Sequence, residues 1–241
     1  MRVAIVIPAR YASTRLPGKP LADLAGKPMI AHVCERARAA PVADAVVVAT
    51  DHEGIALAAR AAGARALLTS PHHRSGTDRV AEAVERLEGE GEDFDVIVNL
   101  QGDEPLIEPA LVAEVVEQLG DGVPMATLAR SLRPEEAANP AVVKVAVDRR
   151  GRALFFSRAP IGGARDGGDA ASFAHLGIYA FVRPFLTTFT QLGESPLERA
   201  EGLEQLRALE HGYPIAVGVC ACESEGVDTP EDLERIRARL G

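Results

Sequence analysis

The chain has 241 residues and a formal net charge of −9, from 35 acidic and 26 basic side chains. This length suffices for one α/β domain with a large core, and we predict a single domain spanning residues 1–241. The acidic balance excludes nucleic acid and anionic membranes as main partners, because these polyanions require a basic surface.

The first half of the chain alternates short apolar runs with amphipathic segments. Residues 3–7 have the composition of a strand that is buried on both faces, and a long loop over 8–27 follows. The next predicted elements, in chain order, are a helix at 28–40, a strand at 45–50, a helix at 53–62, a strand at 64–69, a helix at 75–87, a strand at 96–100 and a helix at 109–119. This alternation predicts an α/β fold with a doubly wound, mostly parallel, Rossmann-like sheet.

The pattern changes after residue 120, where strands follow one another through short turns. Strands are predicted at 125–131, 142–148, 153–157, 175–182 and 214–219, helices near 184–192 and 197–211, and a final helix from Pro230. We therefore predict a small antiparallel excursion over about 125–182 on the parallel sheet.

The three cysteines predict neither a disulfide nor a metal site, and the N-terminus predicts a cytoplasmic protein. Cys220 and Cys222 lie two apart in an apolar run, where the period of a strand would place both on one face and disfavour a disulfide. With Cys34 they offer no zinc-ligand spacing. The first apolar run is too short for a signal-peptide core, and no segment approaches 18 apolar residues. We expect a cytoplasmic protein that does not enter the membrane.

Residues 8–20, Pro-Ala-Arg-Tyr-Ala-Ser-Thr-Arg-Leu-Pro-Gly-Lys-Pro, leave the carboxyl end of the first predicted strand, where open α/β sheets bind ligands. Arg10, Arg15 and Lys19 supply three cations suited to phosphate oxygens. The segment is not a Walker A motif. It predicts a triphosphate-binding loop, and the alternative is a solvated basic loop.

These residues also carry a resemblance to a known family. The segment 7–21 is similar to the opening of the CMP-Kdo synthetases, where Kdo is 3-deoxy-manno-octulosonate. The similarity continues, in order, through Val48-Ala49-Thr50-Asp51, Ser75-Gly76-Thr77-Asp78-Arg79, Asn99-Leu100-Gln101-Gly102-Asp103-Glu104-Pro105, Phe156-Ser157-Arg158, His175-Leu176-Gly177-Ile178-Tyr179, Pro196-Leu197-Glu198 and Gly226-Val227-Asp228-Thr229-Pro230. It covers nearly the whole chain.

The resemblance implies a Mg²⁺ site on two aspartates. Asp103 follows a buried strand by three residues, and Asp228 stands just before the final helix. Phosphate-bound Mg²⁺ commonly uses one or two protein carboxylates. As alternatives, Asp103 could serve a turn and Asp228 could cap the helix, although 229–232 already forms a capping box. Residues 75–78 also match a capping box, so Ser75 can be purely structural.

The resemblance further implies which residues bind the substrates. For the nucleotide they are Pro8, Ala9, Arg10, Arg15, Lys19, Arg74, Ser75, Gly76 and Gln101, of which Arg10, Arg15, Lys19 and Asp103 are the catalytic candidates. For the sugar acid they are Arg158, His175, Tyr179, Glu204 and Gln205. Glu204 and Gln205 fall in the predicted helix 197–211, where a solvated face is the alternative. His175 begins a predicted strand and could be a structural histidine.

The function that the resemblance implies is synthesis of CMP-Kdo and pyrophosphate from CTP and Kdo, for lipopolysaccharide precursors, by a Mg²⁺-dependent homodimer. The sequence departs from the family at 160–163 and at Ala174, which affects the identity of the sugar more than the type of reaction. Alternatives are another acidic sugar, a sugar 1-phosphate, or a nucleotide-binding regulator without catalysis. No side chain is identified as the base that deprotonates the attacking hydroxyl.

Overall fold

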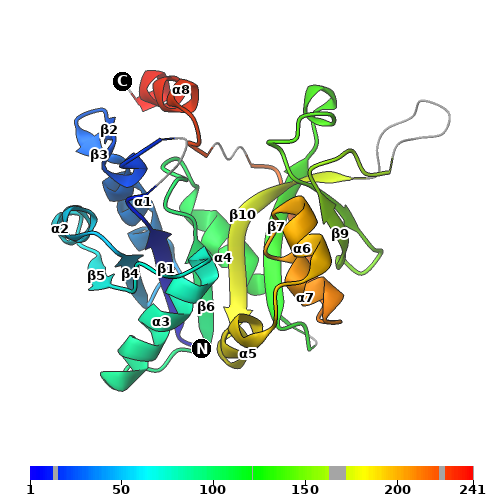
Figure 1. The fold of residues 1–241 in the computed structure, drawn as a ribbon, viewed down its shortest axis with the longest axis horizontal. Helices are drawn as coiled ribbons and strands as arrows, with labels where there is room; N and C mark the ends of the chain where they lie inside the picture. The colour runs from blue at the N-terminus through cyan, green and yellow to red at the C-terminus, as the bar shows by residue number, and fades with distance from the viewer. Residues whose placement is uncertain (13–15, 121, 163–171, 223–225, 241) are drawn as a thin grey trace. The chain divides into compact units, whose positions relative to one another are not determined.

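The computed structural model describes all residues except 13–15, 121, 163–171, 223–225 and 241. The chain forms two units, the first from residues 1–113 and 224–241 and the second from residues 114–223 (Figure 1). Each unit contains its own strands. Within the described residues, no helix is long and apolar enough to cross a membrane.

The sheet of the first unit has the strand order β6–β1–β4–β5, and each neighbouring pair is parallel. Its strands are β1 (Val3–Ala9), β4 (Ala45–Thr50), β5 (Arg65–Leu68) and β6 (Val96–Leu100). Val6 is in register with Val47 on one side and with Asn99 on the other. Every residue of β6 is buried, which explains its unbroken apolar run because strands covered on both faces need no polar side.

Helices α1 (Met29–Arg38), α2 (Glu53–Ala61) and α3 (Gly76–Gly89) connect these strands. α1 and α2 pack on each other and on β4, whereas α3 packs on β1 and β4 (Figure 1). After β5 the chain crosses back over the sheet and forms β6 on the other side of β1. Crossovers are right-handed, so crossovers that run in opposite directions place their helices on opposite faces of the sheet. The predicted doubly wound, mostly parallel α/β fold is therefore confirmed. The strand order reverses beside β1.

The segment after β1 contains more structure than the predicted loop over 8–27. It forms a 3₁₀ helix, η1 (Lys19–Leu21), and a two-stranded hairpin of β2 (Asp23–Leu24) and β3 (Lys27–Pro28). Ala25 and Gly26 turn the hairpin with φ of 51° and 82°, a conformation that suits glycine at the second position. Helix α8 (Pro230–Leu240) packs on this hairpin through Leu24, Met29, Val227, Leu233 and Ile236.

The second unit is largely antiparallel, as predicted. Its strands are β7 (Met125–Ser131), β8 (Lys144–Val147), β9 (Ala153–Ser157), β10 (Phe173–Val182) and β11 (Ile215–Cys220). β10 pairs antiparallel with β7 and β8, β8 pairs antiparallel with β9, and β11 runs parallel to β7. Helix α4 (Pro109–Glu117) leads into this unit, which also holds η2 (Pro134–Glu136) and α5 (Arg183–Gln191).

The predicted helix 197–211 is wrong, because two short helices occupy this region. α6 (Pro196–Glu201) ends at Gly202, whose φ of 62° and ψ of 40° are left-handed, and the N–H of Leu203 donates to the carbonyl of Glu198 at 3.2 Å. α7 (Leu206–Glu210) begins afterwards. Glu204 and Gln205 therefore lie in the turn between the helices.

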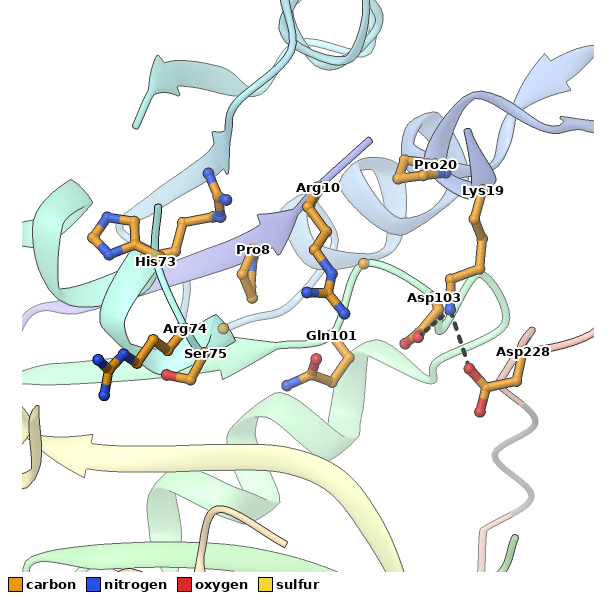
Figure 2. A pocket seen from close by; sticks show the side chains of 14 residues that line it. Pro8, Arg10, Lys19, Pro20, His73, Arg74, Ser75, Gln101, Asp103 and Asp228 are labelled. Atoms are coloured by element: carbon orange, nitrogen blue, oxygen red, sulfur yellow. Dashed lines mark hydrogen bonds and ion pairs between the residues drawn. The ribbon is translucent and has the colours of Figure 1, made fainter. Parts of the chain in front are cut away.

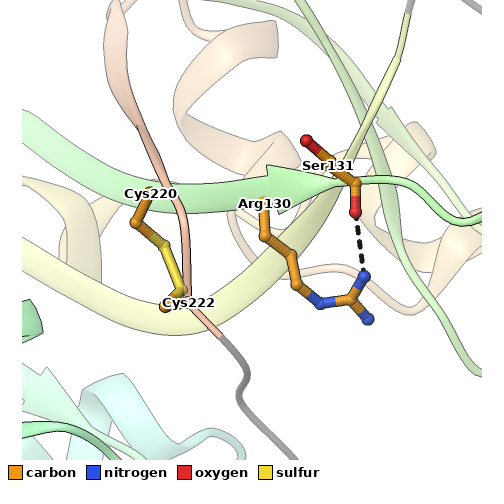
Figure 3. Close-up of a disulfide and its surroundings, with 4 residues drawn as sticks. All are labelled: Arg130, Ser131, Cys220 and Cys222. Carbon is orange, nitrogen blue, oxygen red and sulfur yellow. Dashed lines mark hydrogen bonds between the residues drawn. A yellow bond between two sulfur atoms is a disulfide. The ribbon is translucent and has the colours of Figure 1, made fainter.

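The expectation against a disulfide at Cys220 and Cys222 is also wrong. The structure joins their sulfur atoms, with 5.4 Å between the Cα atoms (Figure 3). The argument from strand period does not apply because β11 ends at Cys220. The chain bends at Ala221, and this bend turns Cys222 back toward the end of the strand. Cys34 is a buried free thiol.

Candidate active site

A cavity lies where the strand order of the first unit reverses. There the segments after β1 and β6 leave the sheet in different directions, which opens a crevice at the carboxyl ends of the strands. The cavity has a volume of about 280 Å³. It is lined by Pro8, Ala9, Arg10, Lys19, Pro20, His73, Arg74, Ser75, Gly76, Arg79, Gln101, Gly102, Asp103 and Asp228 (Figure 2).

All but one of the residues predicted to bind the nucleotide line this cavity, and the remaining one, Arg15, lies outside the described residues. Pro8, Ala9, Arg10, Lys19, Arg74, Ser75, Gly76 and Gln101 all line the cavity. Arg15 belongs to the segment 13–15 that the structure does not describe, so its role stays a prediction. Figure 2 shows the side chain of Arg10 extending toward Gln101.

Lys19 connects the two predicted metal ligands. Its ammonium nitrogen lies 2.6 Å from Oδ2 of Asp103 and 3.2 Å from Oδ1 of Asp228, and it donates to the carbonyl of Val227 at 2.9 Å (Figure 2). An ammonium group has three donors, and these three contacts use all of them. The side chains of Lys19 and Asp103 are 14% and 30% exposed, so this ion pair is partly shielded from water, whereas the side chain of Asp228 is 49% exposed.

Asp228 reaches this position because the start of α8 is held in place. Oδ2 of Asp232 accepts the backbone N–H groups of Asp228 and Thr229 at 3.1 and 2.9 Å, and Oγ1 of Thr229 accepts the N–H of Asp232 at 3.2 Å. The predicted capping box is thus present, and Thr229 rather than Asp228 accepts the N–H of Asp232. The N–H of Val227 also donates to the carbonyl of Asp103 at 2.9 Å, which ties both aspartates together through the backbone.

Two glycines let the cavity walls approach Pro8. A Cβ atom at Gly102 would lie 3.1 Å from the carbonyl oxygen of Pro8, and one at Gly76 would lie 3.4 Å from its ring. The first distance is tight against backbone, which has little freedom to move. Glycine at 102 therefore brings Asp103 close to β1.

The start of α3 forms one wall. Oγ of Ser75 accepts the N–H of Asp78 at 3.0 Å, so Ser75 is the N-cap, as the structural alternative predicted. Ser75 and Gly76 also line the cavity, and the amino end of this helix attracts anions. Both roles are therefore compatible.

Gln101 is oriented by a short amide chain. Its Nε2 donates to Oδ1 of Asn99 at 3.4 Å, and Nδ2 of Asn99 donates to Oγ1 of Thr77 at 3.2 Å. Asn99 is buried within β6, so a polar side chain there needs such partners.

Sequence reasoning missed two charged or titratable residues of the cavity, His73 and Arg79. Arg79 belongs to the segment 75–79, which resembles the CMP-Kdo synthetases, but neither that resemblance nor the spacing of the segment predicted a role for it. It is 4% exposed, and its guanidinium donates to Oγ1 of Thr69 at 2.5 Å and to Oδ2 of Asp51 at 2.9 Å. His73 had no signal in the sequence.

His73 is held at the cavity by Glu82. Nε2 of His73 contacts Oε2 of Glu82, which also accepts the N–H of Ser70 at 2.8 Å. Partial burial would raise the pKa of Glu82, but the hydrogen bonds from Ser70 and His73 together with the nearby charge of Arg86 outweigh it and hold this pKa below its ordinary value. Glu82 is therefore an anion that orients the imidazole ring.

The predicted sugar residues lie in the second unit, where His175 and Tyr179 of β10 are neighbours. Their ring centroids are 5.5 Å apart, and His175 also meets the edge of Phe156 at 5.0 Å. Desolvation lowers the pKa of His175 to about 3 and raises the pKa of Tyr179 well above its ordinary value. Both side chains are neutral at physiological pH and can only donate or accept hydrogen bonds.

The tautomer of His175 follows from Thr127. Oγ1 of Thr127 lies 2.9 Å from Nε2 of His175 and donates its single proton to a backbone carbonyl, with Ile178 at 2.7 Å as the shorter contact. The hydroxyl therefore accepts from Nε2–H, which leaves Nδ1 of His175 as a hydrogen-bond acceptor.

Arg158 and Gln205 supply polar groups in the same unit. Nε of Arg158 donates to the carbonyl of Glu201 at 2.9 Å, and its Nη1 donates to the carbonyl of Pro140 at 3.1 Å. Gln205 is 3% exposed, and its Nε2 has no hydrogen-bond partner among the residues that the structure describes. Burying an amide donor without a partner is costly, which is typical of a group that a ligand satisfies.

A family model, curated relatives and a solved structure all relate this chain to cytidylyltransferases. A family model described as "Cytidylyltransferase" matches residues 4–218. A 3-deoxy-manno-octulosonate cytidylyltransferase of Anaeromyxobacter sp. (strain Fw109-5) is 58% identical over 99% of this chain and 97% of its own, and the protein of that name from Syntrophobacter fumaroxidans is 53% identical over 98% and 96%. A solved structure of CMP:2-keto-3-deoxy-manno-octonic acid synthetase complexed with CTP is 44% identical, with a TM-score of 0.93 over 100% of this chain and 98% of that one.

Proposed function

Because the chain belongs to the 3-deoxy-manno-octulosonate cytidylyltransferase family, we propose that it transfers CMP from CTP to Kdo and releases pyrophosphate. The anomeric hydroxyl of Kdo attacks the α-phosphorus of CTP. A new oxygen–phosphorus bond forms as the bond from the α-phosphorus to the bridging oxygen breaks, and the hydroxyl proton is released. The observation that carries this proposal is the convergence of Arg10, Lys19, Asp103 and Asp228 on one cavity.

The carboxylates of Asp103 and Asp228 fit a Mg²⁺ ion. Both are oxygen donors, which this hard cation prefers, and together they already hold a cation, the ammonium of Lys19. When bound, Mg²⁺ would neutralise the charge of the phosphates at the centre that is attacked. Its remaining ligands would be phosphate oxygens and water.

Arg10 and Lys19 bind and orient the triphosphate in this proposal, together with Arg15. The ammonium of Lys19, which pairs with two carboxylates here, would bind phosphate oxygens by the same charge-assisted hydrogen bonds. The amino end of α3, with Ser75 and Gly76, offers N–H groups to another part of the nucleotide. Phosphoryl transfer depends mainly on such positioning and on charge neutralisation.

Contacts to the sugar acid are assigned to the second unit. Arg158 has more N–H donors than its two carbonyl contacts use and is suited to a carboxylate. His175, Tyr179, Glu204 and Gln205 provide neutral donors, acceptors and one carboxylate for hydroxyl groups. The unpartnered amide of buried Gln205 supports this assignment.

The cellular role of the product, a lipopolysaccharide precursor, is likewise proposed, as are the cytoplasmic location, the single domain and the homodimer. Light scattering coupled to size-exclusion chromatography tests the homodimer directly.

The central experiment measures pyrophosphate release with Mg²⁺, CTP and Kdo, omitting each in turn. Release that requires all three supports the proposal. Replacing CTP with UTP or ATP tests the choice of base, and replacing Kdo with another acidic sugar tests the acceptor. Release only with a different sugar retains the reaction and changes the substrate, whereas no release with any acceptor favours a nucleotide-binding regulator.

A further inference from the structure

Residues 51–54, which form the turn after β4 and the first two residues of α2, touch the segment that follows β1 at two places, Tyr11 and Leu21. At the first place, Oδ1 of Asp51 accepts the N–H of Tyr11 at 3.1 Å. The ring of Tyr11 stacks on the imidazole of His52, with 4.2 Å between the centroids and 15° between the planes. The hydrogen bond joins residues 40 positions apart, and both contacts act on the residue directly after Arg10.

At the second place, residues 51–54 meet η1. A Cβ atom on Gly54 would lie 3.3 Å from Cδ1 of Leu21 and 3.0 Å from the ring of His52, so only glycine permits this approach without displacement. Leu21 stands two residues after Lys19. Residues 51–54 are therefore in contact with the chain on both sides of Lys19, at Tyr11 and at Leu21.

Tyr11 also contacts the chain just before Lys19. Its carbonyl accepts the N–H of Gly18 at 3.1 Å, and a Cβ atom on Gly18 would lie 3.4 Å from the Tyr11 ring. Gly18 has a φ of 69°, and it directly precedes Lys19. Tyr11 is thus in direct contact with the residue that precedes Lys19.

Asp51 ties this arrangement to the cavity wall. Its second oxygen, Oδ2, accepts from the buried Arg79 at 2.9 Å, and Arg79 is anchored to Thr69 at 2.5 Å. One carboxylate therefore fixes the distance between α3 and the backbone of Tyr11. The two oxygens of Asp51 bind two different donors, so the carboxylate must keep one orientation to hold both.

We propose that Asp51 and His52 are positioning residues for the nucleotide: they hold Tyr11, and through it Arg10 and Lys19, in the geometry that binds the triphosphate of CTP. This inference rests on the proposed function for the identity of the ligand. Neither residue lines the described cavity. His52 acts through Tyr11, whereas Asp51 acts through Tyr11 and through Arg79, which does line the cavity. Preorganisation of this kind matters because small displacements of a binding group cost large factors in rate.

His52 allows the positioning role to be separated from a structural one. Besides stacking on Tyr11, it caps α2, since its Nδ1 accepts the N–H of Gly54 at 3.1 Å. His52→Asn keeps a good N-cap and removes the ring. His52→Phe keeps the ring and removes the cap acceptor. The two variants therefore lose different functions of one side chain.

The experiment compares both variants with wild type and with His72→Asn, a control at an exposed histidine. We expect His52→Asn to raise the KM for CTP about tenfold, with the KM for Kdo and the Tm near wild type. We expect His52→Phe to lower the Tm and to retain the wild-type KM for CTP. A wild-type KM for CTP in His52→Asn, or equal KM increases in both variants, would overturn the inference.

A second measurement does not depend on turnover. Amide exchange at Gly18, whose N–H donates to Tyr11, should be faster in nucleotide-free His52→Asn than in wild type or His52→Phe. Unchanged exchange in His52→Asn would contradict the role of the ring. If wild type released no pyrophosphate, the proposed function would fail, and the exchange at Gly18 would still decide whether His52 positions the segment.

Discussion

The ammonium nitrogen of Lys19 lies 2.6 Å from Oδ2 of Asp103, although the two residues are 84 positions apart. Asp228, 209 positions from Lys19, approaches the same nitrogen at 3.2 Å. A Mg²⁺ ion on these two carboxylates and the ammonium of Lys19 cannot share this place, because like charges at such separations repel strongly where water is partly excluded. Lys19 is therefore the counter-ion of these two carboxylates in the structure.

Replacing Lys19 with Met should strengthen metal binding in the absence of nucleotide. The ammonium no longer competes for the carboxylates, so we expect the Kd for Mn²⁺, used as a probe for Mg²⁺, to fall at least about tenfold. Electron paramagnetic resonance of free Mn²⁺ measures this directly. The KM for CTP should rise in the same variant, because a phosphate ligand is lost.

Lys27→Met is the matched control, since Lys27 pairs with Glu35 at an exposed position away from the cavity. It should leave Mn²⁺ binding unchanged. Weaker Mn²⁺ binding in Lys19→Met than in wild type would show that Lys19 supports the metal site instead of competing for it.

Asp103→Asn and Asp228→Asn should each abolish most turnover while leaving the fold intact. Asparagine has the same shape but removes a negative charge from the metal site. Loss of several kcal/mol of transition-state stabilisation corresponds to a fall in kcat of at least about 100-fold. Pyrophosphate release gives the rate, and Mn²⁺ binding should weaken in parallel.

The control for both substitutions is Glu231→Gln, which changes an exposed carboxylate in the first turn of α8. It should retain wild-type turnover. Near-normal rates in Asp103→Asn would rule out its assignment as a metal ligand.

The stability of the protein should decrease as the pH falls below about 6.5, the ordinary pKa of histidine. Desolvation lowers the pKa of His175 to about 3 in the folded chain, so between these values the unfolded chain binds a proton that the folded chain does not. By linkage, the free energy of unfolding is then highest above about pH 6.5 and is lost progressively toward acid.

Urea unfolding at pH 7 and pH 5 tests this. His175→Gln should show a smaller decrease in the free energy of unfolding over that interval than wild type. An equal decrease in both proteins would mean that His175 is not responsible.

Thiol titration should find no reactive cysteine in the folded protein. Cys34 is fully buried, and burial raises the pKa of its thiol to about 12, so almost no thiolate exists at neutral pH. Cys220 and Cys222 are joined in a disulfide. Unfolding without a reductant should release one thiol, and unfolding with a reductant should release three. Three thiols without reductant would contradict the disulfide.

Much of the fold could be predicted because its strands are short apolar runs bounded by turns. Apart from the region of α6 and α7, the predicted ends of the helices and strands after the first loop differ from the observed ones by at most two residues. The break at Gly202 was missed because the residues on both sides keep a helical pattern, and one glycine in the left-handed conformation ended the helix.

The sequence by itself determined the alternation of strands and helices, and with it the sheet edge where the cationic segment after β1 had to lie. Those features depend on local periodicity and on the direction of parallel strands. Only the tertiary structure decided that Lys19 bridges Asp103 and Asp228, that Arg79 reaches the cavity, and that His52 stacks on Tyr11. Such contacts join residues far apart along the chain, and they depend on crossover handedness, helix packing and caps that bring distant side chains together, which a local pattern does not encode.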